Sequence, residues 1–306
     1  MYTGNMYRLV KNIKTVSYGA QYVRNLSTKN LFQFQPKGSY DKDVGPMQAA
    51  VKKLMMSQDD WGVEHPPEVH AARLRRWIDM YFTKLGDHPN YQKAVDNCDH
   101  DEMVVPARDG NDSTVRVLVH TPKNLNCSDS RIGVLYAHGG AVIAGSADLY
   151  KPVLSLLAQE CGVVIYNVDY RLAPETKCPH NILDFYSSLK HISENAENLG
   201  LDKTRIAISG ESGGGYICFG TMVMLAQRGE SSLVKAALPI IPMVSDYFFS
   251  DSLAMTEEER LNVYGMRSAW KAIAQVRDYL IQDKHVRQYD NMSVNMSVNM
   301  MICQIT

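Results

Sequence analysis

The sequence predicts an α/β protein whose core is a mainly parallel, doubly wound sheet with a helical cap. Three observations lead to this prediction. Between residues 101 and 250, short apolar runs alternate with helical patterns, which is the order found in parallel sheets. The run Arg205–Ser209 leads through a glycine-rich turn at 210–214 into a helical pattern that ends near Leu225. Residues 41–100 keep apolar side chains at helical spacing throughout.

Composition fits this fold and argues against several classes of function. The chain has 306 residues, 45% of them hydrophobic, and a net charge of -1, which suits one large domain with additions and not a nucleic-acid binder. No apolar stretch reaches the length of a membrane span. The six cysteines show no metal-binding spacing, so we expect buried free thiols, no metal and no organic cofactor.

The N-terminal segment, residues 1–100, is expected to be helical and to form part of the cap. Its first forty residues contain no Asp or Glu, and apolar residues fall roughly on one helical face. Three interpretations remain: a mitochondrial targeting sequence, a basic helix that contacts a membrane surface, or a cap helix with a solvated basic face. We favour the last of these, and with it a cytoplasmic location.

The predicted core, residues 101–250, begins with two strands at 103–106 and 114–120, separated by turn-forming residues at 109–112. The elements that follow alternate in type. They are a strand at 132–137, a helix at 148–160, a strand at 163–168, a helix at 182–196, a strand at 205–209, a helix to residue 225 and a strand at 236–244.

The motif that carries the chemistry is Gly210-Glu211-Ser212-Gly213-Gly214, placed between a strand and a helix. A serine on such a sharp turn sits in a strained backbone conformation with its hydroxyl clear of the sheet. Small residues at Gly210 and Gly214 let the strand and the helix pass close together. The helix that follows directs the partly positive end of its dipole at charge that develops nearby.

Two further motifs precede this turn in the sequence. The strand at 132–137 runs into His138-Gly139-Gly140-Ala141, where consecutive glycines leave backbone N–H groups open to an approaching substrate. The strand at 163–168 runs into Asp169-Tyr170-Arg171-Leu172-Ala173-Pro174-Glu175. Acyl transfer needs such open N–H groups, because they stabilise the oxyanion of a tetrahedral intermediate.

Together and in this order, the three motifs resemble the hormone-sensitive-lipase branch of the α/β-hydrolases, which includes the arylacetamide-deacetylase-like esterases. The resemblance covers about residues 100–250. It implies that Ser212 is the nucleophile and that the amides of Gly139, Gly140 and Gly213 form the oxyanion hole. His138 would shape the oxyanion loop. The residues that would brace this loop from below are Asp169, Arg171 and Glu175.

One residue departs from the family pattern within the oxyanion loop. Ala141 stands where many relatives carry a third glycine. The two donating amides would precede it, so the resemblance implies a changed acyl pocket with the oxyanion donors retained.

The C-terminal part does not follow the pattern. A serine hydroxyl needs a histidine as general base and a carboxylate to orient that histidine. In this fold both follow the serine, each at the end of its own strand, and the resemblance places them beyond Thr306. We therefore expect the C-terminal strands of the fold, with the acid and the histidine, to be missing from this sequence.

His285 is the only histidine after Ser212 and is a weak candidate base, with Asp283 or Asp290 to orient it. It lies in residues 251–290, which have a charged helical pattern expected for a cap-like insertion. Residues 291–306 form a repetitive tail that supplies no catalytic acid. Without the last strands, the open sheet edge would need a partner or the tail to cover it, and oligomerisation is one solution.

These observations lead to two hypotheses. In the first, the chain is a carboxylic ester hydrolase that acts by serine acylation on small-molecule esters with short or apolar acyl groups, with activity impaired if the acid and the histidine are lost. In the second, it is a non-catalytic protein of the same fold that binds a small apolar ligand or a partner. The presence of a base distinguishes the two.

Overall fold

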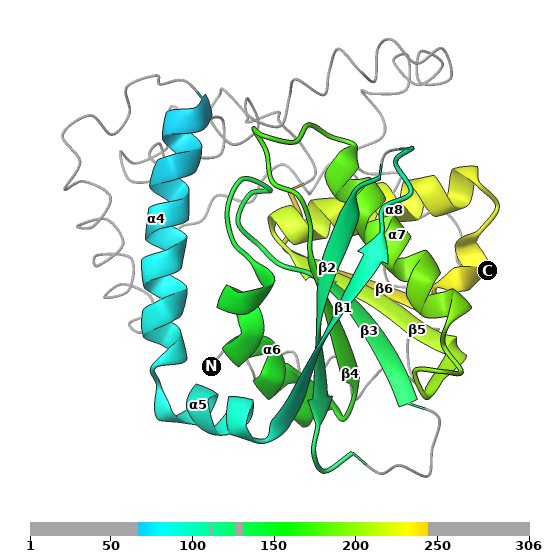
Figure 1. Ribbon diagram of the computed structural model, residues 1–306, viewed down its shortest axis with the longest axis horizontal. Helices are drawn as coiled ribbons and strands as arrows, with labels where there is room; N and C mark the ends of the chain where they lie inside the picture. The colour runs from blue at the N-terminus through cyan, green and yellow to red at the C-terminus, as the bar shows by residue number, and fades with distance from the viewer. Residues whose placement is uncertain (1–66, 111, 126–130, 244–306) are drawn as a thin grey trace, which may run out of the picture. The chain divides into compact units, whose positions relative to one another are not determined.

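The computed structural model describes residues 67–110, 112–125 and 131–243 (Figure 1). They contain an α/β core of six strands, five α-helices and one short 3-10 helix. The helices are α4 (Pro67–Gly86), α5 (Pro89–Asp96), α6 (Ala147–Cys161), α7 (His180–Glu194) and α8 (Gly213–Gln227), with η3 (Ser231–Leu233). The strands are β1 (Cys98–Pro106), β2 (Thr114–Pro122), β3 (Arg131–Ala137), β4 (Val164–Asp169), β5 (Leu201–Glu211) and β6 (Ala236–Ile240).

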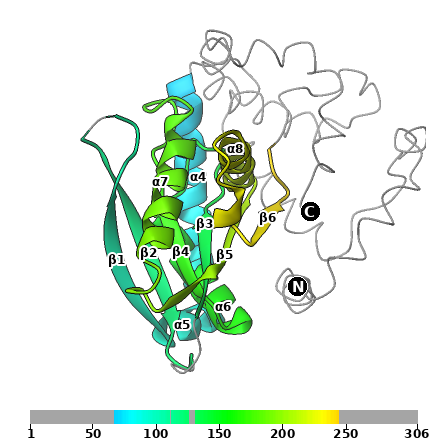
Figure 2. The same cartoon turned by 90° about the vertical axis from the view of Figure 1, so that its right-hand side faces the viewer.

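The six strands form one sheet in the order β1-β2-β4-β3-β5-β6. β2 is antiparallel to both of its neighbours, β1 and β4, whereas β4, β3, β5 and β6 are parallel to one another. The predicted α/β fold with a mainly parallel sheet and an antiparallel opening is therefore confirmed. The parallel strands are joined by helices, as parallel crossovers require (Figure 2).

The elements predicted for the core are all present among the described residues, and the differences lie at their ends. β1 begins at Cys98, five residues before the expected start, because its polar residues pair with β2 along the full length of the hairpin. β5 likewise begins at Leu201 and includes the polar residues 202–205. β6 ends at Ile240, before the expected 244. Apolar periodicity misses the polar ends of strands, which backbone pairing nonetheless extends.

Helices cover both faces of the sheet, and alternate residues of the central strand show this directly. Tyr136 of β3 packs with α6, in a cluster that includes Leu154. Its neighbours Leu135 and Ala137 belong to the cluster that includes residues of α7 and α8. Because successive strand residues point to opposite faces, α6 lies on one face and α7 with α8 on the other. This is the predicted doubly wound arrangement.

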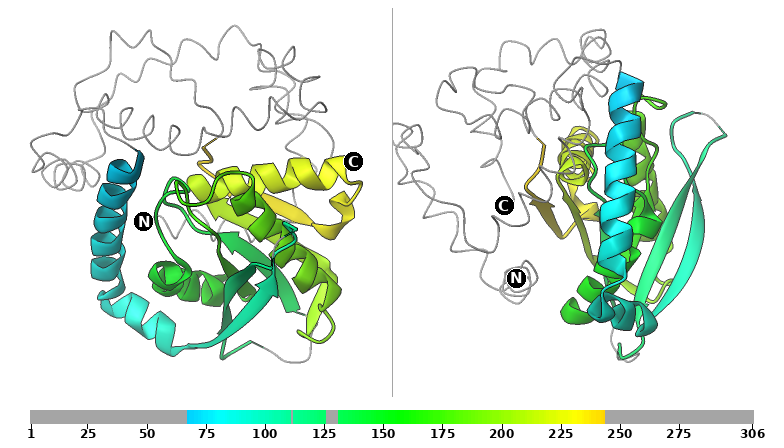
Figure 3. Two further views of the ribbon diagram at one scale, coloured as in Figure 1. Left: turned by 45° about the horizontal axis from the view of Figure 1, so that its top comes forward. Right: turned by 90° about the vertical axis from the view of Figure 1, so that its left-hand side faces the viewer.

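The helix α4 packs on α6 at one side of this core (Figure 3). Trp77 and Tyr81 are stacked at 5.6 Å between ring centroids, and Phe82 stacks on Tyr150 of α6 at 4.4 Å. The helical character expected for 41–100 is thus seen from residue 67 onward. Residues 1–66 and 251–306, with the basic segment, the cap-like insertion and the tail, lie outside the described residues.

The topology brings the three sequence motifs to one edge of the sheet. β3, β4 and β5 are parallel neighbours, and Ala137 at the end of β3 pairs with Val168 of β4 and Gly210 of β5. The residues that follow these strand ends are the three motifs. In α/β proteins, ligands bind at the carboxyl edge of the parallel sheet, so all three motifs lie at one candidate site.

A buried polar cluster lies away from that edge, where β1 and β2 meet α6. His100 and His120 face each other across the β1–β2 ladder, and both contact the Ser155 hydroxyl, at 2.9 Å and 3.4 Å. Ser155 donates its own proton to the Lys151 carbonyl. Burial is the main cause that lowers the pKa of His120, from 6.5 to about 3, with His100 and Lys151 adding to it.

This cluster makes stability depend on pH. Since His120 has a lower pKa when folded, only the unfolded chain takes up its proton between pH 6.5 and about 3, and stability falls as pH falls through that range. Each unit by which the folded and unfolded pKa values differ contributes about 1.4 kcal/mol to the free energy of unfolding.

We expect His120→Gln to make the free energy of unfolding fall less steeply as the pH is lowered. Urea unfolding of the parent and the variant at several pH values from 7 to 4.5 measures this. Replacement of the exposed His88 by Asn is the control, and an equal flattening in both variants would contradict this account.

Candidate active site

Ser212 occupies the turn between β5 and α8 in a strained conformation. Its φ of 51° lies in the left-handed region, which costs a non-glycine residue roughly 1–2 kcal/mol. A Cβ on Gly214 would lie 2.0 Å from the Ala137 carbonyl oxygen, and a Cβ on Gly210 would lie 2.6 Å from the Gly214 oxygen. Both positions therefore require glycine, as the motif predicted.

Backbone hydrogen bonds fix the serine in this conformation. The Ser212 N–H donates to the Ile240 carbonyl at the end of β6, at 2.9 Å. The Ser212 carbonyl accepts from Met243 and from Tyr216, both at 3.1 Å. Ser212 itself is half-buried, whereas Gly213 behind it is buried. The strain is thus held by the neighbouring strand and by the first turn of α8.

The loop after β3 lies directly against this turn. A Cβ on Gly213 would be 2.6 Å from the Val142 nitrogen and 2.9 Å from the Ala141 nitrogen, so the two backbones are in contact. Within the described residues, the N–H groups of Gly139 and Gly140 have no acceptor. The Gly213 N–H begins α8 and has no partner within that helix. These are the three amides that the resemblance assigned to an oxyanion hole.

His138 is a buried support of this loop. Its ring stacks on Tyr170 with centroids 4.2 Å apart, and its Nδ1 lies 2.8 Å from the Gly139 carbonyl. The Tyr170 hydroxyl donates to the His138 carbonyl at 2.7 Å. Burial lowers the pKa of His138 to about 4, so the ring is neutral at pH 7. These contacts agree with a shaping role for His138.

Ala141 adopts a conformation that normally favours glycine. Its φ is 55°, and that of Val142 is 63°, so two successive side-chain-bearing residues occupy the left-handed region. Gly140 precedes them with a φ of 120°. The missing third glycine therefore leaves strain in this loop, and the rest of the structure must hold it in place.

The three predicted bracing residues act at different places. Asp169 accepts from the Ala147 N–H at the start of α6, at 2.8 Å, and so fixes the far end of the loop. Glu175 pairs through both oxygens with Arg75 of α4, at 2.6 and 2.7 Å. Arg75 in turn donates to the loop carbonyl of Ile143 at 2.7 Å. Two of the three residues are thus connected to the loop.

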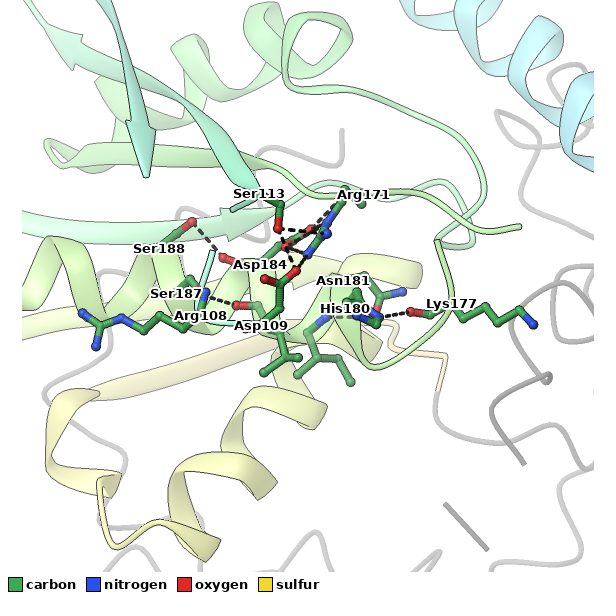
Figure 4. A network of polar contacts seen from close by, with 12 residues as sticks. Arg108, Asp109, Ser113, Arg171, Lys177, His180, Asn181, Asp184, Ser187 and Ser188 are labelled. Atoms are coloured by element: carbon green, nitrogen blue, oxygen red, sulfur yellow. Dashed lines mark hydrogen bonds and ion pairs between the residues drawn. The ribbon is translucent and has the colours of Figure 1, made fainter. Parts of the chain in front are cut away.

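Arg171 holds a separate buried network beside the site (Figure 4). Its guanidinium reaches Asp184 of α7 at 2.6 Å and Asp109 of the β1–β2 turn at 2.8 Å, and both carboxylates are fully buried. It also contacts the Ser113 hydroxyl at 3.3 Å. Arg171 therefore joins the turn, α7 and the loop after β4, and it does not contact the oxyanion loop within the described residues.

Tyr150 and Glu211 form a link that sequence reasoning missed. The Tyr150 hydroxyl donates to Glu211, the residue before Ser212, at 2.5 Å. A Cβ on Gly139 would clash with both groups, at 2.7 and 3.0 Å, so this hydrogen bond passes directly against the loop. The Glu211 side chain is near the nucleophile turn by sequence, but nothing in the sequence signals its tyrosine partner.

No histidine contacts the Ser212 hydroxyl within the described residues. The candidate base His285 lies outside them, and so do Asp283 and Asp290. The Ser155 hydroxyl does contact two histidines, but it is fully buried in α6 and bonds the Lys151 carbonyl. That setting offers no substrate access, so Ser155 does not replace Ser212 as the candidate nucleophile.

Metal ligands are also not grouped in the described core. Residues 67–243, apart from the gaps given above, hold no cluster of three or more His, Cys, Asp or Glu suited to a metal ion. Four cysteines in this part carry free thiols. In the same part, no helix is both long enough and apolar enough to cross a membrane.

Comparison with known proteins identifies the family. The family model of the alpha/beta hydrolase fold matches residues 134–302, more than half of the chain. The chain belongs to the α/β-hydrolase family. This α/β-hydrolase is 30% identical to arylacetamide deacetylase-like 3 of Mus musculus over 198 residues, which are 59% of this chain and 48% of the relative. It is 30% identical to hormone-sensitive lipase of Mus musculus over 126 residues, 40% of this chain and 17% of that protein.

Solved structures agree with this assignment. The thermophilic carboxylesterase EstE1, cloned from a metagenomic library, superposes with a TM-score of 0.55 and 26% identity, over 68% of this α/β-hydrolase and 67% of the esterase. The predicted hormone-sensitive-lipase branch of the α/β-hydrolases is thus confirmed. The chain spans about half the length, or less, of the first curated relatives it matches.

The Arg171 network gives a sharp stability prediction. Arg171→Met leaves two buried carboxylates without their cation, and we expect the free energy of unfolding to fall by about 3–5 kcal/mol at pH 7. Arg108→Met removes a half-exposed ion pair to Glu194 and should cost less than about 1 kcal/mol. Urea unfolding of both variants measures the difference, and similar losses would refute the importance of the buried network.

Proposed function

We propose that this α/β-hydrolase cleaves carboxylic esters through a covalent acyl-enzyme formed at Ser212. The proposal rests on one observation, the contact between the backbone of the Ser212 turn and the backbone of the loop after β3. The strained Ser212 turn lies in contact with a loop whose Gly139 and Gly140 amides have no acceptor among the described residues. A nucleophile beside open N–H donors is what acyl transfer requires.

In the proposed reaction, the Ser212 hydroxyl oxygen attacks the ester carbonyl carbon while a base takes the hydroxyl proton. The carbonyl electron pair moves to oxygen, and the amides of Gly139, Gly140 and Gly213 donate to that oxyanion. The pair then returns, the carbon–alkoxide bond breaks, and the base gives its proton to the leaving alcohol. Water repeats the sequence on the acyl-serine and releases the acid.

The proposal requires a base, and His285 is the candidate. It is the only histidine that follows Ser212 in the sequence, and Asp283 or Asp290 could orient its ring. The neutral His138 is a poor candidate, because its Nδ1 faces the Gly139 carbonyl and its ring is buried against Tyr170. It supports the oxyanion loop and does not act on the serine.

The substrate we propose is a small ester with a short or apolar, uncharged acyl group. The arylacetamide-deacetylase-like relative and the carboxylesterase named above support an ester or a related acyl compound. Ala141 adds a methyl side chain where the family pattern has a third glycine, and it keeps a positive φ of 55°, so we expect a modified acyl pocket and not a lost one. No cofactor takes part in this mechanism.

A second candidate is a non-catalytic member of the family that binds a small apolar ligand or a partner at this edge of the sheet. One observation favours it: within the described residues, no histidine reaches Ser212. Loss of a base lowers turnover by about 10⁴-fold or more, whereas the oxyanion hole alone retains a residual rate above water. Turnover by the chain therefore separates the two candidates.

We expect the purified, folded chain to hydrolyse a short-chain aryl ester, and Ser212→Ala to lower kcat by roughly 10³-fold or more. If His285 is the base, His285→Ala should show a loss of similar size. His180→Ala, at the start of α7, is the matched histidine control and should retain the parent rate. Parent turnover no higher than that of folded Ser212→Ala would instead favour the ligand-binding candidate.

A further inference from the structure

One arginine of α4 joins the two loops that flank the candidate site. The Arg75 guanidinium donates through Nε to the Ile143 carbonyl at 2.7 Å and through Nη2 to the Ala173 carbonyl at 3.1 Å. The same group forms a two-oxygen pair with Glu175. Ile143 lies in the loop after β3, whereas Ala173 and Glu175 lie in the loop after β4. A single side chain thus connects one helix to both loops.

The loop that Arg75 contacts is the strained one. Ala141 and Val142 both have positive φ, and such residues keep this conformation only when their surroundings hold them there. Backbone hydrogen bonds give part of this support: the Gly140 carbonyl accepts from Ala144 at 2.9 Å and from Ile143 at 3.1 Å, and the Val142 carbonyl accepts from Ala173 at 2.9 Å. A further support comes from Arg75, which donates to the next carbonyl along the chain, that of Ile143.

The Arg75 contact also differs from the backbone hydrogen bonds in the elements that it connects. The hydrogen bonds to the Gly140 carbonyl lie within the loop and would persist if the whole loop shifted. The hydrogen bond from Ala173 to Val142 joins the loop after β4 to the loop after β3. Of these contacts, only that of Arg75 ties the loop to α4, which is packed through Phe82 against Tyr150. Arg75 therefore fixes the loop relative to α4, in addition to the supports from Asp169 and Tyr170.

We propose that Arg75 is a positioning residue that holds the oxyanion loop at the distance from Ser212 needed for acyl transfer. This inference rests on the proposed function. Arg75 does not meet the reacting atoms; it acts through the Ile143 carbonyl and the loop amides before it. A displacement of about 1 Å at a reacting group can cost roughly 100-fold in rate, so one anchor of this loop has a large effect.

The geometry requires arginine and not merely a positive charge. The planar guanidinium carries several N–H donors in a fixed fork, which lets it bind two carbonyls and a carboxylate at once. A lysine has one ammonium centre and cannot reach three acceptors from two loops in this way. The Glu175 carboxylate is 61% exposed, so its pair with Arg75 orients the guanidinium more than it stabilises the fold.

The test uses the full chain with Arg75→Gln, Arg75→Lys and the control Arg76→Gln, in which an exposed arginine of the same helix is replaced. With a short-chain aryl ester, we expect both Arg75 variants to lower kcat roughly 10- to 100-fold, with KM changed less than about threefold. Arg76→Gln should keep both values. Loss of a purely structural contact would lower the melting temperature and leave kcat of the folded fraction unchanged.

Hydrogen–deuterium exchange gives a second readout that needs no turnover. We expect faster exchange in the peptides that contain residues 139–145 and 171–176 of both Arg75 variants, and unchanged exchange in β3 and β5. Exchange unchanged from the parent overturns the inference, whether or not the chain is active. Faster exchange with unchanged kcat in an active parent also overturns it. Absence of turnover in the parent refutes the proposed function alone, and the exchange result still decides whether Arg75 holds the loop.

Discussion

The structure depends on one backbone contact, where the start of α8 passes the end of β3. A single methyl group on Gly214 would lie 2.0 Å from the Ala137 carbonyl oxygen, so no other residue fits without moving the helix or the strand. This approach forces Ser212 into a left-handed conformation and brings Gly213 against the loop at Ala141. The nucleophile and the oxyanion donors are therefore neighbours because the sheet and the helix meet so closely. The chemistry of the site is a consequence of that packing.

The strain that this contact creates is distributed over surrounding elements. Ile240 of β6 holds the Ser212 amide, Tyr170 supports His138 from below, and Asp169 fixes the start of α6. These supports come from two segments that are distant in sequence, the end of β6 and the residues at the end of β4, so the site depends on the assembled sheet. Strained residues at an active site persist in this way, because many independent contacts determine their conformation.

The sequence alone predicted the fold class, the order of the core elements and the three motifs that follow strands. These features follow from local patterns: apolar alternation, glycines at tight turns and strand–helix order. Asp169 contacts the start of α6 and Glu175 contacts Arg75, whereas Arg171 contacts α7 and the β1–β2 turn; their roles as supports of the oxyanion loop stay predictions. That distinction depends on Asp184 and Asp109, which are distant in sequence from each other.

The contacts that could not be predicted share one physical property. Arg75 lies 68 residues from Ile143, and Tyr150 lies 61 residues from Glu211. No periodicity or composition marks an arginine on a helix as a partner of a distant carbonyl, because that pairing arises only from tertiary packing. The ends of β1 and β5 were missed for a related reason, since backbone pairing extends strands through polar residues. The base and its carboxylate stay predictions from sequence.

The central claim is that the Ser212 hydroxyl becomes acylated, and covalent labelling tests it most directly. The folded chain would be treated with an aryl fluorophosphonate, followed by intact-mass and peptide mass spectrometry. We expect one adduct, on the peptide that contains Ser212, and none in Ser212→Ala. An adduct on a different residue, or a folded parent chain that acquires none above the Ser212→Ala background, would contradict it.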